Sequence, residues 1–331
     1  MRPFEYRRAE GVEQAGALAL AGGRLIAGGT NLLDLMKLQV ETPAQLVDVN
    51  RLPLREIEPL ADGGLRIGAL VSNSACAADP RVRAGWPLLA RAILAGATFQ
   101  LRNKATTAGN LCQRTRCHYF YNPDQPCNKR APGSGCGALG GFNRIHAILG
   151  ASDQCIATYP GDMAVALAAL DAAVVIAAPD GSQRSVPVRG FHRLPGDTPE
   201  KDNVLEPGEV ILAVTLPPPA GGTQLYRKVR ERSSYAFALV SVAAAVRMEG
   251  GRIAQASLAF GALAHRPWRD PRVDALLTGA RPGDALFAEA ADLLLEGAQG
   301  RGHNDFKIPL TRRTLVAVLR EATGTQPGDQ A

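Results

Sequence analysis

Short hydrophobic runs separated by glycines and polar turns predict small strands and helices in the first two thirds of the chain. Apolar runs bounded by turn residues predict strands, and apolar positions at helical spacing behind a capping residue predict helices. The expected strands are 24–27, 45–50, 65–70 and 209–217, and the expected helices are 31–39, 86–97, 162–171 and a stretch beginning near Ser72 and Asn73. This succession is typical of a mixed fold of helices and sheets.

Two hairpins and three closing helices are expected in the second half. The sequence PDG predicts the turn of one hairpin over 172–188, and the sequence GG predicts the turn of another over 240–263. The stretch PPPAGG at 217–222 predicts a linker and a domain boundary. The closing helices are expected near 272–278, 283–298 and 309–323.

The periodicity fails over 102–144, and most of the cysteines lie in or just after this stretch. Cys112, Cys117, Cys127 and Cys136 are followed by Cys155. A loop of this length inside a compact chain is commonly functional. Clustered cysteines in a chain without an export signal indicate metal binding before disulfides.

The spacing of these cysteines leaves three interpretations open. Iron–sulfur clusters accept wide, loop-borne spacings and need four thiolates, which favours a cluster with one cysteine to spare. Structural zinc usually shows paired C-x2–4-C knuckles, which only the 112 and 117 pair approaches. The third interpretation is that the cysteines are buried and bind nothing. The five histidines show no metal-binding spacing and are expected to be structural or surface residues.

Two glycine-containing turns carry the remaining candidate chemistry. In the segment 26–32, Gly28 and Gly29 let backbone N–H groups approach an anion at the start of a helix, which suits the diphosphate of a cofactor. The alternative is a plain strand-to-helix turn. The segment 106–110 combines hydroxyls, a glycine and an asparagine, and the two turns together are able to clamp one extended cofactor.

Composition and charge narrow the class of protein. The 331 residues are 46% hydrophobic and 21% charged, and 37 Lys and Arg against 31 Asp and Glu give a net charge of +6. Because the basic residues are scattered, no nucleic-acid partner is expected. No run reaches the ~18 apolar residues of a membrane helix, so no membrane insertion is expected. The N-terminal sequence MRPFEYRRAEG lacks the apolar region of a signal peptide, so the chain is expected in the cytoplasm as translated.

Four segments in this order, AGGTNLLDLMK, TTAGNL, ATYPGDMAVALAALDA and YRKVRERSSYAFALVSVAAAV, resemble the FAD-binding medium subunit of the xanthine dehydrogenase family of molybdenum hydroxylases. The similarity runs from about residue 1 to 325. The cysteine-bearing insertion between TAGNL and PGDM resembles that of bacterial, often periplasmic, aldehyde oxidoreductases. In those proteins, and in the related hydroxybenzoyl-CoA reductase, the insertion carries an additional [4Fe–4S] cluster.

The resemblance implies an α+β fold in which two subdomains of the vanillyl-alcohol-oxidase (PCMH) type hold FAD between them. A C-terminal antiparallel sheet with helices would follow. The implied divisions are 1–60, 61–218 with the iron–sulfur insertion at about 112–155, 223–325, and a disordered tail at 326–331.

The same resemblance implies the residues of both cofactor sites. For FAD these are the pyrophosphate loop Ile26, Ala27, Gly28, Gly29, Thr30, Asn31, Leu32 and Leu33, the second clamp Thr107, Gly109, Asn110 and Gln113, and the pair Asp162 and Lys228. For the [4Fe–4S] cluster they are Cys117, Cys127, Cys136 and Cys155, with Cys112 in reserve. No catalytic residue is expected on this chain, because the redox chemistry belongs to the FAD.

The implied function is electron transfer within a heterotrimer, in which the substrate site lies on a partner subunit. A large molybdenum-cofactor subunit would oxidise an aldehyde, a small [2Fe–2S] subunit would pass the electrons to this chain, and an external acceptor would receive them. Export to the periplasm would then depend on a partner subunit. The alternatives are a free-standing flavin reductase of the same fold and a zinc-stabilised binding module.

Overall fold

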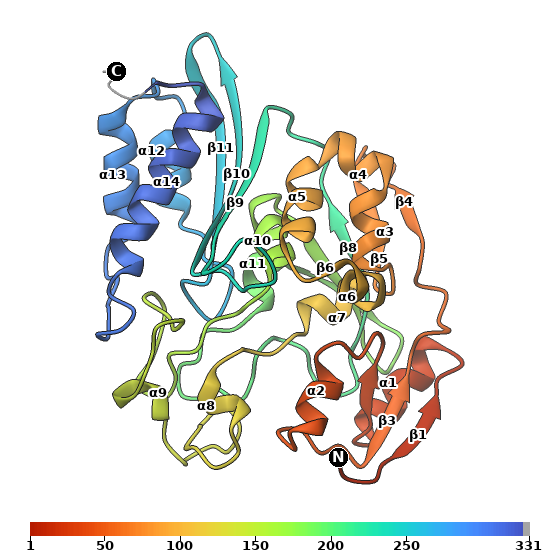
Figure 1. The fold of residues 1–331 in the computed structure, drawn as a ribbon. Coiled ribbons are helices and arrows are strands. Elements are labelled where there is room, and N and C mark those ends of the chain that lie inside the picture. The colour runs from red at the N-terminus through yellow and green to blue at the C-terminus, as the bar shows by residue number, and fades with distance from the viewer. Residues whose placement is uncertain (327–331) are drawn as a thin grey trace.

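The computed structural model describes residues 1–326 as an α+β protein with three separate sheets (Figure 1). The tail expected to be disordered over 326–331 lies, from residue 327 on, outside the described residues. Within the described part of the chain, no helix has the length and apolar content that crossing a bilayer requires.

The first sheet is small and parallel, in the order β1-β3-β2, and it places the first glycine turn. Parallel neighbours need crossover connections, and two helices supply them. The turn at 27–31 lies between strand β2 and helix α2. The elements are β1 (Glu5–Arg8), α1 (Val12–Leu20), β2 (Arg24–Ile26), α2 (Leu32–Lys37) and β3 (Gln45–Asp48).

The second sheet has five antiparallel strands in the order β4-β5-β8-β6-β7. Its strands are β4 (Ile57–Pro59), β5 (Leu65–Gly68), β6 (Ala173–Ala177), β7 (Gln183–Pro187) and β8 (Val210–Leu216). Between β5 and β6 the chain forms α3 (Asn73–Ala78), α4 (Pro80–Gly85), α5 (Pro87–Ala95), α6 (Phe99–Lys104), α7 (Thr107–Leu111) and α10 (Asp162–Ala169), and α11 (Val188–Phe191) follows β7. Ser72, Thr98 and Thr106 cap α3, α6 and α7 through their hydroxyls.

The cysteine-bearing insertion follows α7 and is almost entirely loop. Its two single-turn helices are α8 (His118–Tyr121) and α9 (Gly137–Gly140). In Figure 1 the insertion lies between α2, near the first sheet, and the C-terminal helices. It is therefore placed between parts of the chain that are far apart in sequence.

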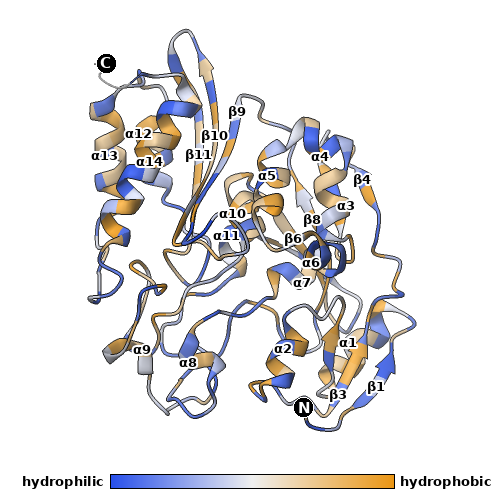
Figure 2. Ribbon diagram, viewed as in Figure 1, coloured by the Kyte–Doolittle hydropathy of each residue, from blue (hydrophilic) through white to orange (hydrophobic). Residues whose placement is uncertain are grey.

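The C-terminal part is a three-stranded antiparallel sheet covered by helices. Its elements are β9 (Thr223–Val229), β10 (Val240–Glu249), β11 (Arg252–Gly261), α12 (Pro271–Leu277), α13 (Asp284–Leu294) and α14 (Lys307–Thr323). The hairpin predicted around Gly250-Gly251 is confirmed, and both glycines take the positive φ, 56° and 74°, that this two-residue turn requires. Helix α14 packs on β10, while the apolar α10 packs against β10 and β11 (Figure 2).

Candidate functional site

The first glycine turn lies directly against the backbone that precedes the second. A Cβ placed on Gly28 would stand 2.0 Å from the carbonyl oxygen of Lys104, so only glycine allows this approach. Gly29 has φ +70°, and a Cβ there would meet Leu33 at 2.9 Å. Within residues 1–326 no acceptor is recorded for the backbone N–H groups of residues 28–31, which leaves them available to an anion.

Asparagine side chains hold both ends of this turn. Nδ2 of Asn50 donates to the carbonyl oxygen of Ala27 at 2.9 Å. Oδ1 of Asn31 accepts from the backbone N–H of Arg114 at 2.9 Å, and its Nδ2 donates to the hydroxyl of Tyr121 at 3.2 Å. The predicted residue Asn31 therefore connects the pyrophosphate loop to the start of the cysteine-bearing insertion.

The second turn is the single-turn helix α7. Thr106 caps it, and the buried Thr107 donates through Oγ1 to the carbonyl oxygen of Val71 at 3.1 Å. The side-chain amide of Gln113 donates to the side chain of Asn110 at 3.1 Å and to its carbonyl oxygen at 3.0 Å. Of the predicted residues of the second clamp, Asn110 and Gln113 are therefore bonded directly, while Thr107 and Gly109 lie on the same short helix as Asn110.

Asp162 and Lys228 form a buried ion pair from two different elements. Nζ of Lys228, on β9, donates to Oδ2 of Asp162, at the start of α10, at 2.8 Å, and their side chains are 4% and 9% exposed. The hydroxyl of Tyr226 donates to Oδ1 of the same carboxylate at 2.6 Å. A Cβ on Gly96 would stand 2.8 Å from this carboxylate, so the pair lies against the loop after α5.

A network of buried polar contacts links this pair to the second turn. Nδ2 of Asn110 donates to Oδ1 of Asn73 at 3.3 Å, and Asn73 in turn contacts the sulfur of Met163 at 3.3 Å. The hydroxyl of Tyr159 donates to the carbonyl oxygen of Asn110 at 2.9 Å. The structure therefore brings the two turns and the start of α10 into one region, as a single extended cofactor requires.

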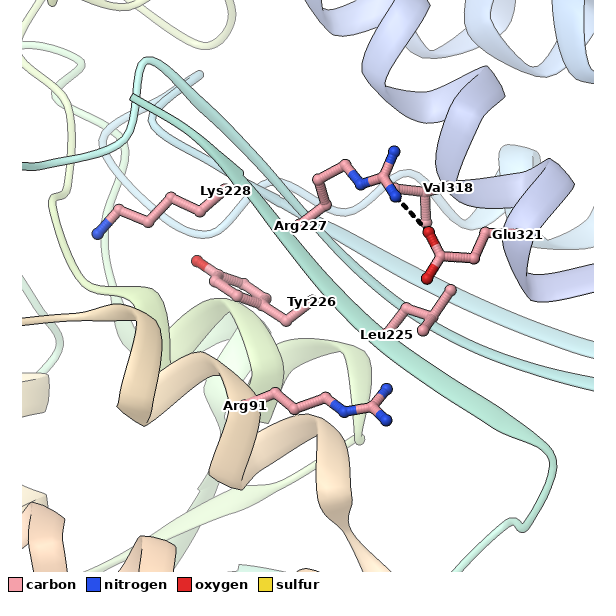
Figure 3. A pocket seen from close by; sticks show the side chains of 7 residues that line it. All are labelled: Arg91, Leu225, Tyr226, Arg227, Lys228, Val318 and Glu321. Carbon is pink, nitrogen blue, oxygen red and sulfur yellow. Dashed lines mark hydrogen bonds and ion pairs between the residues drawn. The ribbon is translucent and has the colours of Figure 1, made fainter. Parts of the chain in front are cut away.

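A cavity of about 390 Å³ lies beside β9 (Figure 3). The side chains of Tyr226 and Lys228 point to one side of the strand. Those of Leu225 and Arg227 point toward α14, where Arg227 pairs with Glu321. A second cavity of about 470 Å³ follows β3 and is lined by residues 50–53, 55 and 56. It begins at Asn50, which supports the first turn.

Three of the five clustered cysteines lie in one buried region, and the half-buried Cys136 lies at its edge. Cys117, Cys127 and Cys155 share a small hydrophobic cluster with Leu35 of α2. The backbones of Cys127 and Cys136 pair across the loop in an isolated antiparallel β-bridge, and both thiols are free. Interaction with the Cys155 side chain lowers the pKa of Cys136 to about 6 and outweighs the effect of burial, which raises it.

Cys112 lies apart from this group. It ends α7, it packs against the main core, and burial raises the pKa of its thiol to about 11. Within residues 1–326 no three or more His, Cys, Asp or Glu side chains converge in the way that a single metal ion requires. The ligands of an iron–sulfur cluster bind different irons and do not converge on one atom, so the thiolate set fits a cluster in its chemistry.

Two buried histidines touch these cysteines. Nε2 of His146 lies 3.1 Å from Sγ of Cys117, and Nε2 of His265 lies 3.2 Å from Sγ of Cys155. Burial lowers the pKa of His146 to about 4 and lowers that of His265 well below its ordinary value. Both were expected to be structural or surface residues, and sequence reasoning missed their contact with the cysteines.

The basic residues among the cysteines hold the loop in place. Lys129, whose side chain is 2% exposed, donates to Asp202 at 2.6 Å, and Arg114 donates to the same carboxylate at 2.6 Å. Burial raises the pKa of Asp202, but Lys129 and Arg114 outweigh it and hold that pKa below its ordinary value. Arg130 donates to the carbonyl oxygens of Tyr119 and Phe120.

Comparison with known proteins identifies the class of protein. A family model described as the FAD binding domain in molybdopterin dehydrogenase matches residues 2–219, and one described as the CO dehydrogenase flavoprotein C-terminal domain matches residues 224–322. The chain therefore belongs to the FAD-binding medium subunits of the molybdenum hydroxylase family, and it is an oxidoreductase subunit that binds FAD.

Individual relatives match along nearly the whole chain. The aldehyde oxidoreductase FAD-binding subunit PaoB of Escherichia coli is 54% identical over 325 residues, which cover 97% of this chain and 99% of that one. Quinoline 2-oxidoreductase from Pseudomonas putida has a TM-score of 0.74 at 27% identity, covering 98% of both chains. Carbon monoxide dehydrogenase from Hydrogenophaga pseudoflava has a TM-score of 0.76 at 26% identity, also covering 98% of both. The family and the α+β fold inferred from the sequence are confirmed.

Proposed function

We propose that the chain is the FAD and [4Fe–4S] electron-transfer subunit of a heterotrimeric molybdenum hydroxylase that oxidises an aldehyde to a carboxylic acid. The similarity to an aldehyde oxidoreductase subunit along nearly the whole chain supports the aldehyde as substrate class. The two family segments span residues 2–322, and neither describes a molybdenum or [2Fe–2S] unit. A large molybdenum-cofactor subunit and a small [2Fe–2S] subunit are therefore proposed as partners.

The roles of the flavin-site residues follow from their contacts. The free N–H groups of residues 28–31 would bind the pyrophosphate. Thr107, Gly109, Asn110 and Gln113, which lie on α7 or just after it, would bind the adjoining polar chain of the FAD. Asp162, held by Tyr226 and Lys228, keeps a fixed carboxylate beside that region. Bound FAD supplies one- and two-electron redox chemistry, and the chain supplies binding and orientation.

The observation that carries the cluster assignment is the grouping of Cys117, Cys127, Cys136 and Cys155. They come from a span of nearly forty residues that is almost entirely loop, yet three of them share one buried region with Leu35 of α2, and the half-buried Cys136 pairs with Cys127 at its edge. Four thiolates are the donor set of a [4Fe–4S] cluster. Since α2 also follows the pyrophosphate loop, the proposed cluster and the flavin site share a helix. Electrons would enter from the [2Fe–2S] partner and leave to an external acceptor.

The test is a spectrum of the anaerobically purified full chain, with flavin and metals assayed on the same sample. About one FAD and about four irons per chain are expected. Cys127→Ser should lose the iron and keep the flavin, whereas the matched control Cys112→Ser should keep both. Zinc in place of iron, or flavin alone, would overturn the cluster. Folded protein without flavin would overturn the whole proposal, and NADPH oxidation by the isolated chain would favour a free-standing reductase.

A further inference from the structure

Two histidines from distant parts of the chain direct the same ring nitrogen at two of the grouped cysteines. His146 belongs to the insertion, and His265 follows β11 in the C-terminal sheet. Their Nε2 atoms lie 3.1 Å from Sγ of Cys117 and 3.2 Å from Sγ of Cys155. The two residues are 1% and 7% exposed, so water does not replace these contacts.

The surroundings of each ring determine which nitrogen carries the hydrogen. Nδ1 of His146 and Nδ1 of His265 are both buried and have no hydrogen-bond partner among residues 1–326. A neutral imidazole carries one N–H, and a buried N–H without an acceptor costs more than a buried lone pair without a donor. The hydrogen therefore sits on Nε2 in both rings, and each ring donates to a cysteine sulfur.

The backbone around His146 fixes its ring relative to the cysteines. Its N–H donates to the carbonyl oxygen of Asn143 at 2.9 Å. Its carbonyl oxygen accepts from Nζ of Lys307 at 2.8 Å and from Nδ2 of Asn304 at 3.3 Å. His265 follows Ala264, whose carbonyl oxygen accepts from the N–H of Tyr159 at 3.0 Å. Both donors are therefore presented by a framework that the C-terminal part of the chain completes.

We propose that His146 and His265 are positioning residues that donate N–H···S hydrogen bonds to the cluster thiolates and raise the reduction potential of the cluster. The inference rests on the cluster of the proposed function. Reduction adds one electron and no proton, and it breaks no bond. Because the added negative charge spreads onto the thiolate sulfurs, each N–H dipole stabilises the reduced state more than the oxidised state. Hydrogen bonds to the sulfurs are one of the means by which proteins set such potentials.

The experiment is an EPR-monitored redox titration of the anaerobically purified full chain, with iron counted in every sample. His146→Leu and His265→Leu remove the donor, whereas His146→Gln and His265→Gln keep an N–H close to the position of Nε2. The matched control is His192→Leu. His192 is equally buried and also has an unpartnered Nδ1, but its Nε2 contacts the carbonyl oxygen of Leu111 at 2.8 Å.

Each leucine variant is expected to lower the ratio of reduced to oxidised cluster about tenfold at a fixed applied potential, which is a shift of about 59 mV for one electron. The glutamine variants and the His192 control should titrate like the wild type. Leucine variants with full iron and an unchanged potential would overturn the inference, as would glutamine variants that shift as far. If the leucine variants lose their iron, the glutamine variants provide the test: a wild-type potential is the expected result, and a shifted potential would overturn the inference. Wild-type protein without iron would overturn the cluster itself, and the iron count separates that result from the others.

Discussion

Gly28→Ala tests whether the approach of the first turn to residue 104 is what shapes the flavin site. The added Cβ would lie 2.0 Å from the carbonyl oxygen of Lys104 and 2.7 Å from its carbonyl carbon, both backbone atoms. Side-chain carbons essentially never approach other atoms closer than 3.0 Å, so the two segments must separate by about 1 Å. Overpacking of this kind costs about 1–3 kcal/mol. Since the loop that moves is the one that would bind the pyrophosphate, this cost is expected to appear in FAD binding.

At about 1.4 kcal/mol per tenfold, the expected loss of FAD affinity is about 5- to 140-fold. The assay is titration of deflavinated protein with FAD, followed by quenching of flavin fluorescence, with Tm measured in parallel. The control is Gly190→Ala, because Gly190 is exposed in α11 and a Cβ there meets nothing within 4 Å. A Gly28→Ala protein with wild-type FAD affinity would refute the reasoning, whether or not its Tm is lowered.

Three further outcomes follow from buried charges. Asp162→Asn leaves Lys228 buried without its counter-charge, so flavin content should fall and unfolding should be easier by about 3–5 kcal/mol, measured by denaturant titration. Asp202→Asn removes the partner of the buried Lys129 and should cost a similar amount, seen as increased proteolysis of the insertion; equal protease resistance would contradict it. Burial lowers the pKa of Lys307 from 10.5 to about 7, so the unfolded state binds more protons between these values and stability should rise with pH across that range. Lys307→Met should flatten this dependence in pH-resolved thermal melts.

The elements that the sequence predicted well are those with strong periodicity or a capping residue. Helix α14 combines an apolar stripe with a glycine stop, and Ser72 caps α3 as expected. Strand β1 was missed because all four residues of EYRR are exposed, so its position depends on pairing with β3 and not on a hydrophobic pattern. The single-turn helices α8 and α9 have no periodicity to detect.

The candidate site shows the same division between local and distant information. The two glycine turns could be identified because each needs particular residues at consecutive positions. His146 and His265 are 119 residues apart, and nothing in their spacing indicates that both reach the same group of cysteines. Asn73 looked like part of a helix start, whereas its side chain connects the second turn to α10.

The contacts that hold the insertion also set an order of events during synthesis. Nδ2 of Asn143 donates to the carbonyl oxygen of Arg301, 158 residues further along the chain, and Asn304 and Lys307 hold the carbonyl oxygen of His146. At about 5–20 residues per second, the ribosome delivers these partners about 8 to 30 s after the insertion. The contacts that hold the cysteine-bearing insertion therefore stay incomplete until translation is nearly finished. A chain truncated before residue 301 keeps every cysteine but lacks the structure that holds their loop.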